Sequence, residues 1–143
     1  MIVYLDTSAL VPLLIREPAT DRCTLLWESA ESLVAIPLLY VEAAAALHKA
    51  RRMNRVINTE LATALRSLDA LWQNISRMAV TDDVVHSAAA LAGRYGLRGH
   101  DAVHCAAGLI LADSPDTALA SADAKLLSAW TDSGAAVFDA SAP

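Results

Sequence analysis

Only two cysteines occur in this sequence, Cys23 and Cys105, and neither stands in a CxxC pair or in the Cys/His spacing of a zinc site. This pattern favours reduced, structural thiols over a disulfide framework or a zinc centre. Charge or proline interrupts every apolar stretch well short of the length of a membrane span. No glycine-rich loop of the Walker type is present, which argues against nucleotide-driven chemistry.

Positive charge is also scarce. The net charge of −5 argues against bulk electrostatic attraction to nucleic acid, although it does not exclude a local basic track. The chain opens directly on the apolar residues Met1 to Leu5, without the basic stretch of a signal peptide, so we expect a cytoplasmic protein. Hydrophobic residues make up 55% of the chain, which is more than one small core needs, so we expect an oligomer or an obligate partner.

A chain of 143 residues predicts one domain, here residues 1–143, in which short strand-like runs alternate with longer helical ones. The expected strands are Ile2–Leu5, Ser32–Ile36, Arg77–Val80, Ala118–Ser121 and Ala135–Phe138. The expected helices are Ala9–Ile15, Ala19–Ala30, Pro37–Arg52, Thr59–Asn74, Asp82–Tyr95, His100–Leu111 and one that starts at Asp123. Such alternation indicates an α/β fold in which helices cover both faces of a parallel sheet, a three-layer α/β/α sandwich.

Four acidic residues stand in apolar surroundings, where a charge is costly unless a cation or hydrogen bonds meet it. Asp6 ends the first strand, Asp123 follows the fourth, and Glu42 and Asp101 fall early in helices. Because the functional crevice of such sheets lies beyond the carboxyl ends of the strands, we expect the four carboxylates to converge there. Oxygen ligands of this kind suit Mg²⁺ or Mn²⁺, so the sequence predicts a metal-dependent nuclease.

Each acid also has an ordinary structural interpretation. Asp6 and Asp123 could be helix N-caps, Asp101 could complement a helix dipole, and Glu42 could face solvent on a helix. No single position decides the matter, and the argument depends on the combination.

The combination resembles the signature segments of PIN domains, and the short single-domain length resembles the VapC toxins of bacterial toxin–antitoxin pairs. The segments are Asp6-Thr-Ser-Ala-Leu10, Glu42 within an apolar helix, Asp101-Ala-Val-His104 and Ser121-Ala-Asp123. Each is weak alone, but their order and spacing over the whole chain are fairly specific. Ser121 departs mildly from the family, which more often has threonine there.

The resemblance implies a five-stranded parallel sheet between helices, dependence on Mg²⁺ or Mn²⁺, and endonucleolytic cleavage of RNA. Asp6 and Asp101 match the principal metal-binding acids of the family, and Glu42 and Asp123 match those that complete the site. A homodimer, a cognate VapB-type antitoxin and product ends of 5′-phosphate and 3′-hydroxyl are also implied. We expect the dimer and antitoxin surfaces on the alanine-rich and leucine-rich helices, including Leu10 to Ile15.

Other marked residues are less specific. We interpret Arg98, His100 and Ser121 as substrate contacts, together with Arg94. His104 lies one helical turn after Asp101 and could orient a carboxylate, although a hydrogen-bonded core histidine is the commoner case. The basic run His48, Lys49, Arg51, Arg52 and Arg55 could contact phosphates or could simply be solvated. The three tryptophans are too scattered to form a base-stacking platform, so we expect them in packing.

Two alternatives remain at this stage. A non-catalytic module could keep the fold and work through partner contacts, but retention of all four acids speaks against it. A phosphatase of the haloacid dehalogenase type also begins with Asp after a strand. It usually needs a second Asp two residues later, where this chain has Ser8.

Overall fold

The computed structural model describes residues 1–143, and its centre is one five-stranded sheet. The strands are β1 (Ile2–Leu5), β2 (Ser32–Ala35), β3 (Ile75–Arg77), β4 (Thr117–Ser121) and β5 (Val137–Asp139). Their order is β3-β2-β1-β4-β5, and every neighbouring pair is parallel, with Tyr4 in register with Val34 and Leu119. The predicted five-stranded parallel sheet is confirmed.

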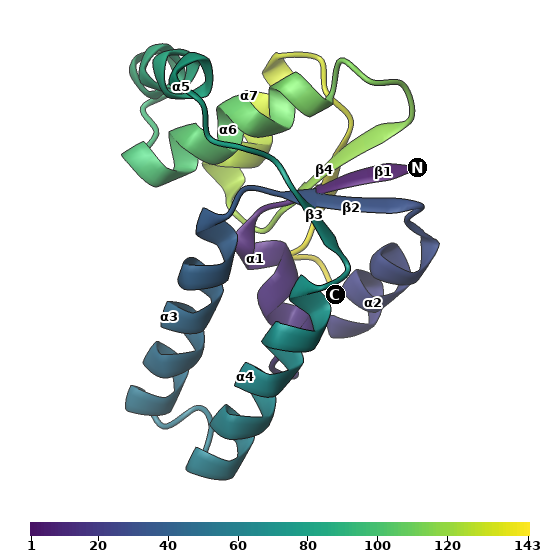
Figure 1. Cartoon of the computed structure of the whole chain (residues 1–143), viewed down its shortest axis with the longest axis vertical. Coiled ribbons are helices and arrows are strands. Elements are labelled where there is room, and N and C mark those ends of the chain that lie inside the picture. The colour runs from purple at the N-terminus through teal and green to yellow at the C-terminus, as the bar shows by residue number, and fades with distance from the viewer.

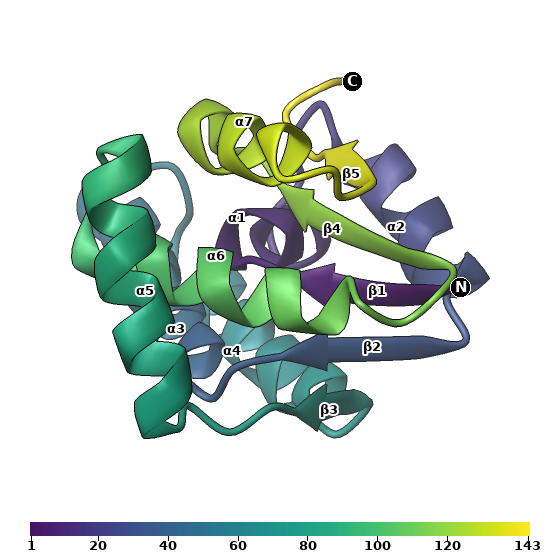
Figure 2. The same ribbon diagram turned by 90° about the horizontal axis from the view of Figure 1, so that it is seen from above.

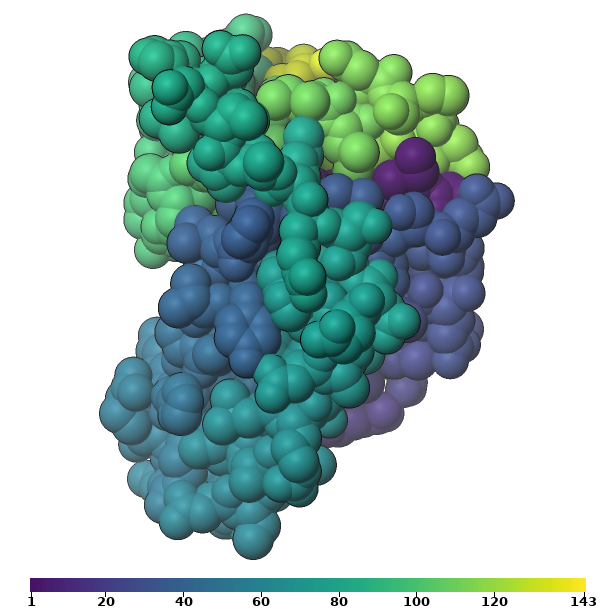
Figure 3. All heavy atoms as spheres, viewed as in Figure 1, coloured from purple at the N-terminus to yellow at the C-terminus, as the bar shows by residue number.

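Helices cover both faces of this sheet (Figure 1). They are α1 (Thr7–Leu10), the 3₁₀ turn η1 (Val11–Leu13), α2 (Thr20–Ser29), α3 (Leu38–Arg52), α4 (Asn58–Trp72), α5 (Asp82–Tyr95), α6 (Gly99–Leu111) and α7 (Ala124–Asp132). Helices α5, α6 and α7 lie on one side, and α1 to α4 lie on the other. The hairpin of α3 and α4 projects away from the sheet and forms the lower end of the molecule in the space-filling view (Figure 3).

The alternation of side chains along β1 divides the apolar interior into two cores. Val3 and Leu5 point into the core shared with α1 to α4, whereas Tyr4 points into the core shared with α5 to α7. Successive residues of a strand face opposite sides of a sheet, so a strand covered on both faces is apolar throughout. This explains why the N-terminal run lacks polar residues until Asp6, and it fixes the three-layer architecture.

Three predicted elements need correction. The expected helix Ala9–Ile15 is instead the short α1 followed by η1, because Pro12 has no N–H to continue the α-helical hydrogen bonds and the chain tightens into a 3₁₀ turn. The third strand lies at Ile75–Arg77 rather than Arg77–Val80, since Ile75 is the residue buried against the core. The fifth strand is shifted to Val137–Asp139, where Val137 pairs with Leu119.

The turn between α5 and α6 depends on a glycine. Gly96 ends α5 in the left-handed conformation with φ +65°, which a residue with a side chain adopts only at a cost. The chain then turns through Arg98, the N-cap residue of α6, so that Asp101 falls in the first turn of that helix.

Both cysteines are free and buried, in agreement with the structural interpretation of the thiols. Burial raises the pKa of the Cys105 thiol to about 11, which leaves it almost entirely protonated at neutral pH. None of the helices combines the length and the hydropathy that crossing a membrane would require.

The contact between α6 and α7 generates the first prediction. A Cβ built on Gly108 would lie 2.9 Å from the ring of Trp130, which is fully buried and cannot move away without disturbing the second core. Gly93, in the last turn of α5, has no atom within 4 Å of a Cβ at that position. We expect Gly108→Ala to be less stable than Gly93→Ala by about 1–3 kcal/mol, because overpacking opposes the gain in helix propensity that both variants share. Urea unfolding of the two variants measures this difference, and equal midpoints would contradict the contact.

Candidate active site

The four predicted carboxylates line a single pocket beyond the carboxyl ends of the strands. Its volume is about 510 Å³. Seen from above, the arrowheads of β1, β2 and β4 point toward this edge, where α6 begins and α1 follows β1 (Figure 2). Its lining consists of Asp6, Thr7, Ser8, Val11, Glu17, Glu42, Ala46, Lys49, Arg98, His100, Asp101, Ala122 and Asp123. The expected convergence of residues 6, 42, 101 and 123 is therefore present in the fold.

Asp6 is positioned by serine hydroxyls. It is the N-cap of α1, and its Oδ2 accepts hydrogen bonds from Ser8 Oγ at 2.6 Å and from Ser121 Oγ at 2.9 Å. The same hydroxyls accept in turn, Ser8 Oγ from the Ala122 N–H at 2.7 Å and Ser121 Oγ from the Asp123 N–H at 3.0 Å. These bonds join the end of β1 to the end of β4 and place Asp6 beside Asp123.

Ser121, which we expected to contact the substrate, instead supports the side chain of Asp6. The residue is fully buried, its hydroxyl faces Asp6, and it is absent from the lining of the pocket. A small hydroxyl side chain at the end of a central strand can reach the neighbouring strand end, which is what Ser121 does here.

Asp123 is the N-cap of α7, where its Oδ1 accepts from the Leu126 N–H at 2.9 Å. The capping interpretation of both aspartates is thus correct in the structure, and it does not compete with a role in the pocket. A carboxylate that uses one oxygen as a cap keeps the other oxygen for a ligand.

Glu42 extends from the second turn of α3 and meets a buried histidine of α6. His104 Nε2 lies 2.7 Å from Glu42 Oε1 and 3.6 Å from Asp6 Oδ1, and His104 Nδ1 lies 2.9 Å from the Tyr4 hydroxyl. Burial lowers the pKa of His104, but the hydrogen bond to Glu42 and the charges of Asp6, Glu42 and Asp101 together raise it above its ordinary value. His104 is therefore a core histidine that also contacts the acids.

Asp101 is flanked by the two cationic candidates that precede it. Arg98 Nε donates to Asp101 Oδ2 at 3.0 Å, and His100 Nε2 lies 3.5 Å from Asp101 Oδ1. Arg98 and His100 are both exposed and both line the pocket, as expected of substrate contacts. Arg94 does not reach the pocket and pairs with Asp132 of α7 at 3.5 Å.

The structure adds two residues that the motifs did not single out for the site. Lys49 lies seven residues after Glu42 on α3, and helical periodicity places residues 42, 46 and 49 on one face. This seven-residue spacing from Glu42 could have distinguished Lys49, already in the sequence, from the basic residues around it. Glu17 enters the pocket from the loop after η1 and pairs with Arg55 at 3.0 Å. Its place depends on tertiary packing, and no local pattern in the sequence indicates it.

The donor set fits a hard divalent cation, although the side chains as they lie form no group of three or more that could hold one. Each of the four carboxylates has one oxygen bonded to the protein and a second oxygen that accepts no hydrogen bond. Four adjacent carboxylates repel one another, and a cation bound by their remaining oxygens would relieve that repulsion. Small rotations of these carboxylates, of which Asp6 is buried and the other three are half-buried, would be needed to complete a coordination shell.

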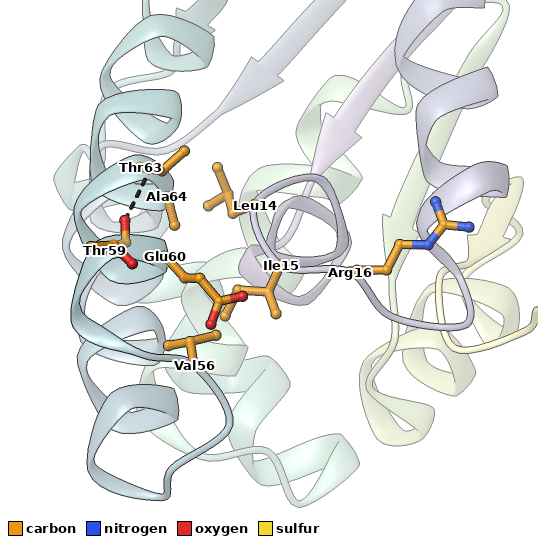
Figure 4. Close-up of a pocket in the computed structure, with 8 residues that line it drawn as sticks. All are labelled: Leu14, Ile15, Arg16, Val56, Thr59, Glu60, Thr63 and Ala64. Carbon is orange, nitrogen blue, oxygen red and sulfur yellow. Dashed lines mark hydrogen bonds between the residues drawn. The ribbon is translucent and has the colours of Figure 1, made fainter.

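A second pocket differs in character. It has a volume of about 320 Å³ and lies between the end of η1 and α4, with Leu14, Ile15, Val56 and Ala64 among its lining (Figure 4). Its one carboxylate, Glu60, accepts from the Ile57 N–H at 3.0 Å as part of the capping of α4. A single engaged carboxylate offers no catalytic arrangement, so the pocket of the four carboxylates is the candidate active site.

Comparison with known proteins agrees with this geometry. The PIN domain family matches residues 3–129 of the chain. The ribonucleases VapC45 and VapC49 of Mycobacterium tuberculosis are each 36% identical to the chain over 112 residues, which is 78% of this chain and 78% of either relative.

Solved structures show the same fold. PAE2754 from Pyrobaculum aerophilum has a TM-score of 0.66 and 24% identity, covering 95% of this chain and 81% of that one. VapBC2 from Rickettsia felis, bound to a DNA fragment from its promoter, has a TM-score of 0.63 and 12% identity, covering 97% of this chain and 98% of that one. FitAcB from Neisseria gonorrhoeae has a TM-score of 0.60 and 18% identity, covering 98% of each chain.

The serine bridge between the strand ends generates a second prediction. Replacing Ser8 by alanine removes a donor to Asp6 and leaves the Ala122 N–H without its acceptor. We expect Ser8→Ala to lose about 1–3 kcal/mol of unfolding free energy, because a part-buried donor is left unsatisfied. Urea denaturation measures the loss. The control is Ser87→Ala on the exposed face of α5, expected to change stability by less than about 0.5 kcal/mol. Equal effects of the two changes would show that the bridge contributes nothing.

Proposed function

The chain belongs to the PIN-domain family, and from that premise we propose that it is a metal-dependent endoribonuclease, the toxin of a VapBC-type toxin–antitoxin pair. The observation that carries the proposal is the meeting of four carboxylates, from the ends of β1 and β4 and from α3 and α6, in one open pocket. The similarity to the VapC ribonucleases supplies the substrate class. The haloacid dehalogenase alternative is wrong, since the family match, over residues 3–129, is to PIN domains.

Asp6, Glu42, Asp101 and Asp123 would hold Mg²⁺ or Mn²⁺. When bound, such an ion stabilises the developing charge on phosphate oxygens and makes water a stronger nucleophile. The four acidic side chains would present their free carboxylate oxygens to the ion in the pocket. Ser8 and Ser121 keep Asp6 in place, and the N-terminus of α7 keeps Asp123 in place. The expected products carry a 5′-phosphate and a 3′-hydroxyl.

Cationic side chains at the rim would bind the RNA backbone. Arg98 and His100 enter the pocket from α6 and the turn before it, and Lys49 enters from α3. Arg98 is bonded to Asp101 and would have its charge partly neutralised by that acid, whereas Lys49 makes no ion pair. Phosphate contacts of this kind position a substrate without reading its bases, and they give an acidic protein a local basic track.

We further propose a homodimer and a VapB-type antitoxin as partners. The Rickettsia felis and Neisseria gonorrhoeae neighbours support the antitoxin, since one is titled as a VapBC pair and the other as FitAcB. Exposed apolar side chains on both sides of the sheet are available for partner contacts, among them Leu25, Val41, Met53, Ile57, Val85 and Ile110. Within the expected segment Leu10–Ile15, Leu10 and Pro12 are buried in the core, so only residues around Leu14 and Ile15 remain for a partner.

Asp6→Asn tests the activity. We expect the purified, antitoxin-free protein to cleave RNA in Mg²⁺ or Mn²⁺, to lose cleavage in EDTA, and to lose it by at least about 100-fold in Asp6→Asn, because the amide removes a ligand charge. Asp113→Asn, the same chemical change in an exposed loop, is the control and keeps full activity. The measurement is gel analysis of a total cellular RNA pool. A folded protein that cleaves nothing would favour the non-catalytic binding module.

Lys49→Ala tests the substrate track. We expect this variant to raise KM for RNA several-fold with kcat little changed, and to lower the slope of log affinity against log salt by about 0.7–1, the value for one phosphate contact. Arg52→Ala removes a charge from an exposed side chain of the same helix outside the pocket and is the matched control. Steady-state kinetics over a range of salt concentrations distinguishes the two. Identical behaviour would remove Lys49 from the track.

A further inference from the structure

Behind the acidic pocket lies a buried polar chain that crosses three elements. Tyr4 of β1, His104 of α6 and Glu42 of α3 follow one another through hydrogen bonds of 2.9 Å and 2.7 Å. Tyr4 and His104 are each 0% exposed, and neither lines the pocket. Only Glu42, at the far end of this series of hydrogen bonds, reaches the pocket.

The hydrogen bonds of the chain specify where its protons lie. A carboxylate only accepts, so the short contact with Glu42 Oε1 requires a proton on His104 Nε2. In the neutral imidazole, which has one N–H, Nδ1 is then an acceptor and the Tyr4 hydroxyl donates to it. In the imidazolium, Nδ1 also carries a proton and Nε2 still donates to Glu42. A tyrosine hydroxyl carries its proton at neutral pH, so Tyr4 is available as this donor. The Tyr4 hydroxyl and both nitrogens of His104 are satisfied in this arrangement, and Glu42 keeps Oε2 free.

The opposite tautomer fails at both ends. It would direct the lone pair of Nε2 at the carboxylate of Glu42, and it would turn the Tyr4 hydroxyl, surrounded by apolar side chains, away from its acceptor. The Tyr4 ring cannot easily turn to compensate, because it packs edge-on against Trp130 with ring centroids 5.9 Å apart. The Tyr4 hydroxyl thus selects which imidazole nitrogen carries the hydrogen.

We propose that Tyr4 and His104 are positioning residues of the acid site, with Tyr4 holding the imidazole in its Nε2–H tautomer so that Nε2 fixes the carboxylate of Glu42 in the pocket. A glutamate on a helix has several accessible rotamers, and this bond selects one that engages Oε1 and leaves Oε2 free for a ligand. The same N–H lies 3.6 Å from Asp6 Oδ1, so it also separates two carboxylates that repel each other. The proposal rests on the proposed function for its kinetic consequences, but not for the tautomer.

Three variants separate positioning from plain packing. Tyr4→Phe keeps the ring and removes only the hydroxyl. His104→Gln carries an amide nitrogen near the place of Nε2, whereas the shorter His104→Asn has one near Nδ1 and does not reach Glu42. His86→Gln, on the exposed face of α5, is the control and identifies one of the four histidine signals.

The first measurement is ¹⁵N NMR of the imidazoles in the metal-free protein. At a pH high enough for the imidazole to be neutral, we expect His104 as the Nε2–H tautomer in the wild type and a mixture of tautomers in Tyr4→Phe. A wild-type Nδ1–H tautomer, or an unchanged tautomer in Tyr4→Phe, would overturn the proposal. This readout is independent of any nuclease activity.

The second measurement is kcat and KM for RNA, with Mn²⁺ affinity from the EPR signal of free Mn²⁺. We expect His104→Asn to lose about 10- to 100-fold in kcat and in Mn²⁺ affinity with KM for RNA unchanged, and His104→Gln to recover most of both. If His104→Asn and His104→Gln lose kcat and Mn²⁺ affinity equally, and in proportion to their losses of stability in urea, His104 has only a packing role and the proposal is overturned. If the wild type cleaves no RNA, the proposed function fails, and the tautomer and the Mn²⁺ affinity still decide this inference.

Discussion

Repulsion among carboxylates gathered at one edge of the sheet is the constraint on which this structure depends. The parallel order puts the carboxyl ends of β1 and β4 side by side, so Asp6 and Asp123 are neighbours by topology. Helices α3 and α6 then add Glu42 and Asp101 to the same pocket. An arrangement of this kind costs folding free energy, and it persists only if each acid finds compensating donors or a cation.

The compensation is divided among different kinds of donor. Asp6 is met by two hydroxyls, Asp123 by a backbone N–H at the start of α7, Glu42 by a buried imidazole and Asp101 by the guanidinium of Arg98. None of these partners occupies both oxygens of a carboxylate. Stabilisation of the folded chain and availability of the acids to a ligand are therefore compatible, which is a property that a surface salt-bridge network would not provide.

Much of this could be predicted from residue types and their order. The alternation of apolar strands and longer helices predicts the parallel sheet, and the position of Asp6 and Asp123 directly after strands predicts their convergence. The boundaries that failed are those decided by tertiary contacts. Pro12 tightened a helix that periodicity would have continued, and the burial of Ile75 moved the start of the third strand by two residues. Local pattern cannot show which of several apolar residues the core will receive.

The same limit explains the outcome for individual side chains of the site. Ser121 and His104 were identified as notable from the sequence, but their partners lie more than 60 residues away, so only the fold reveals that one supports Asp6 and the other contacts Glu42. Glu17 shows the limit most clearly, because a loop residue without a motif enters the pocket through packing alone. Lys49 is the intermediate case. Its helical phase relative to Glu42 is fixed by the sequence, and once Glu42 is placed at the pocket, the position of Lys49 on the same face follows from the geometry of the helix.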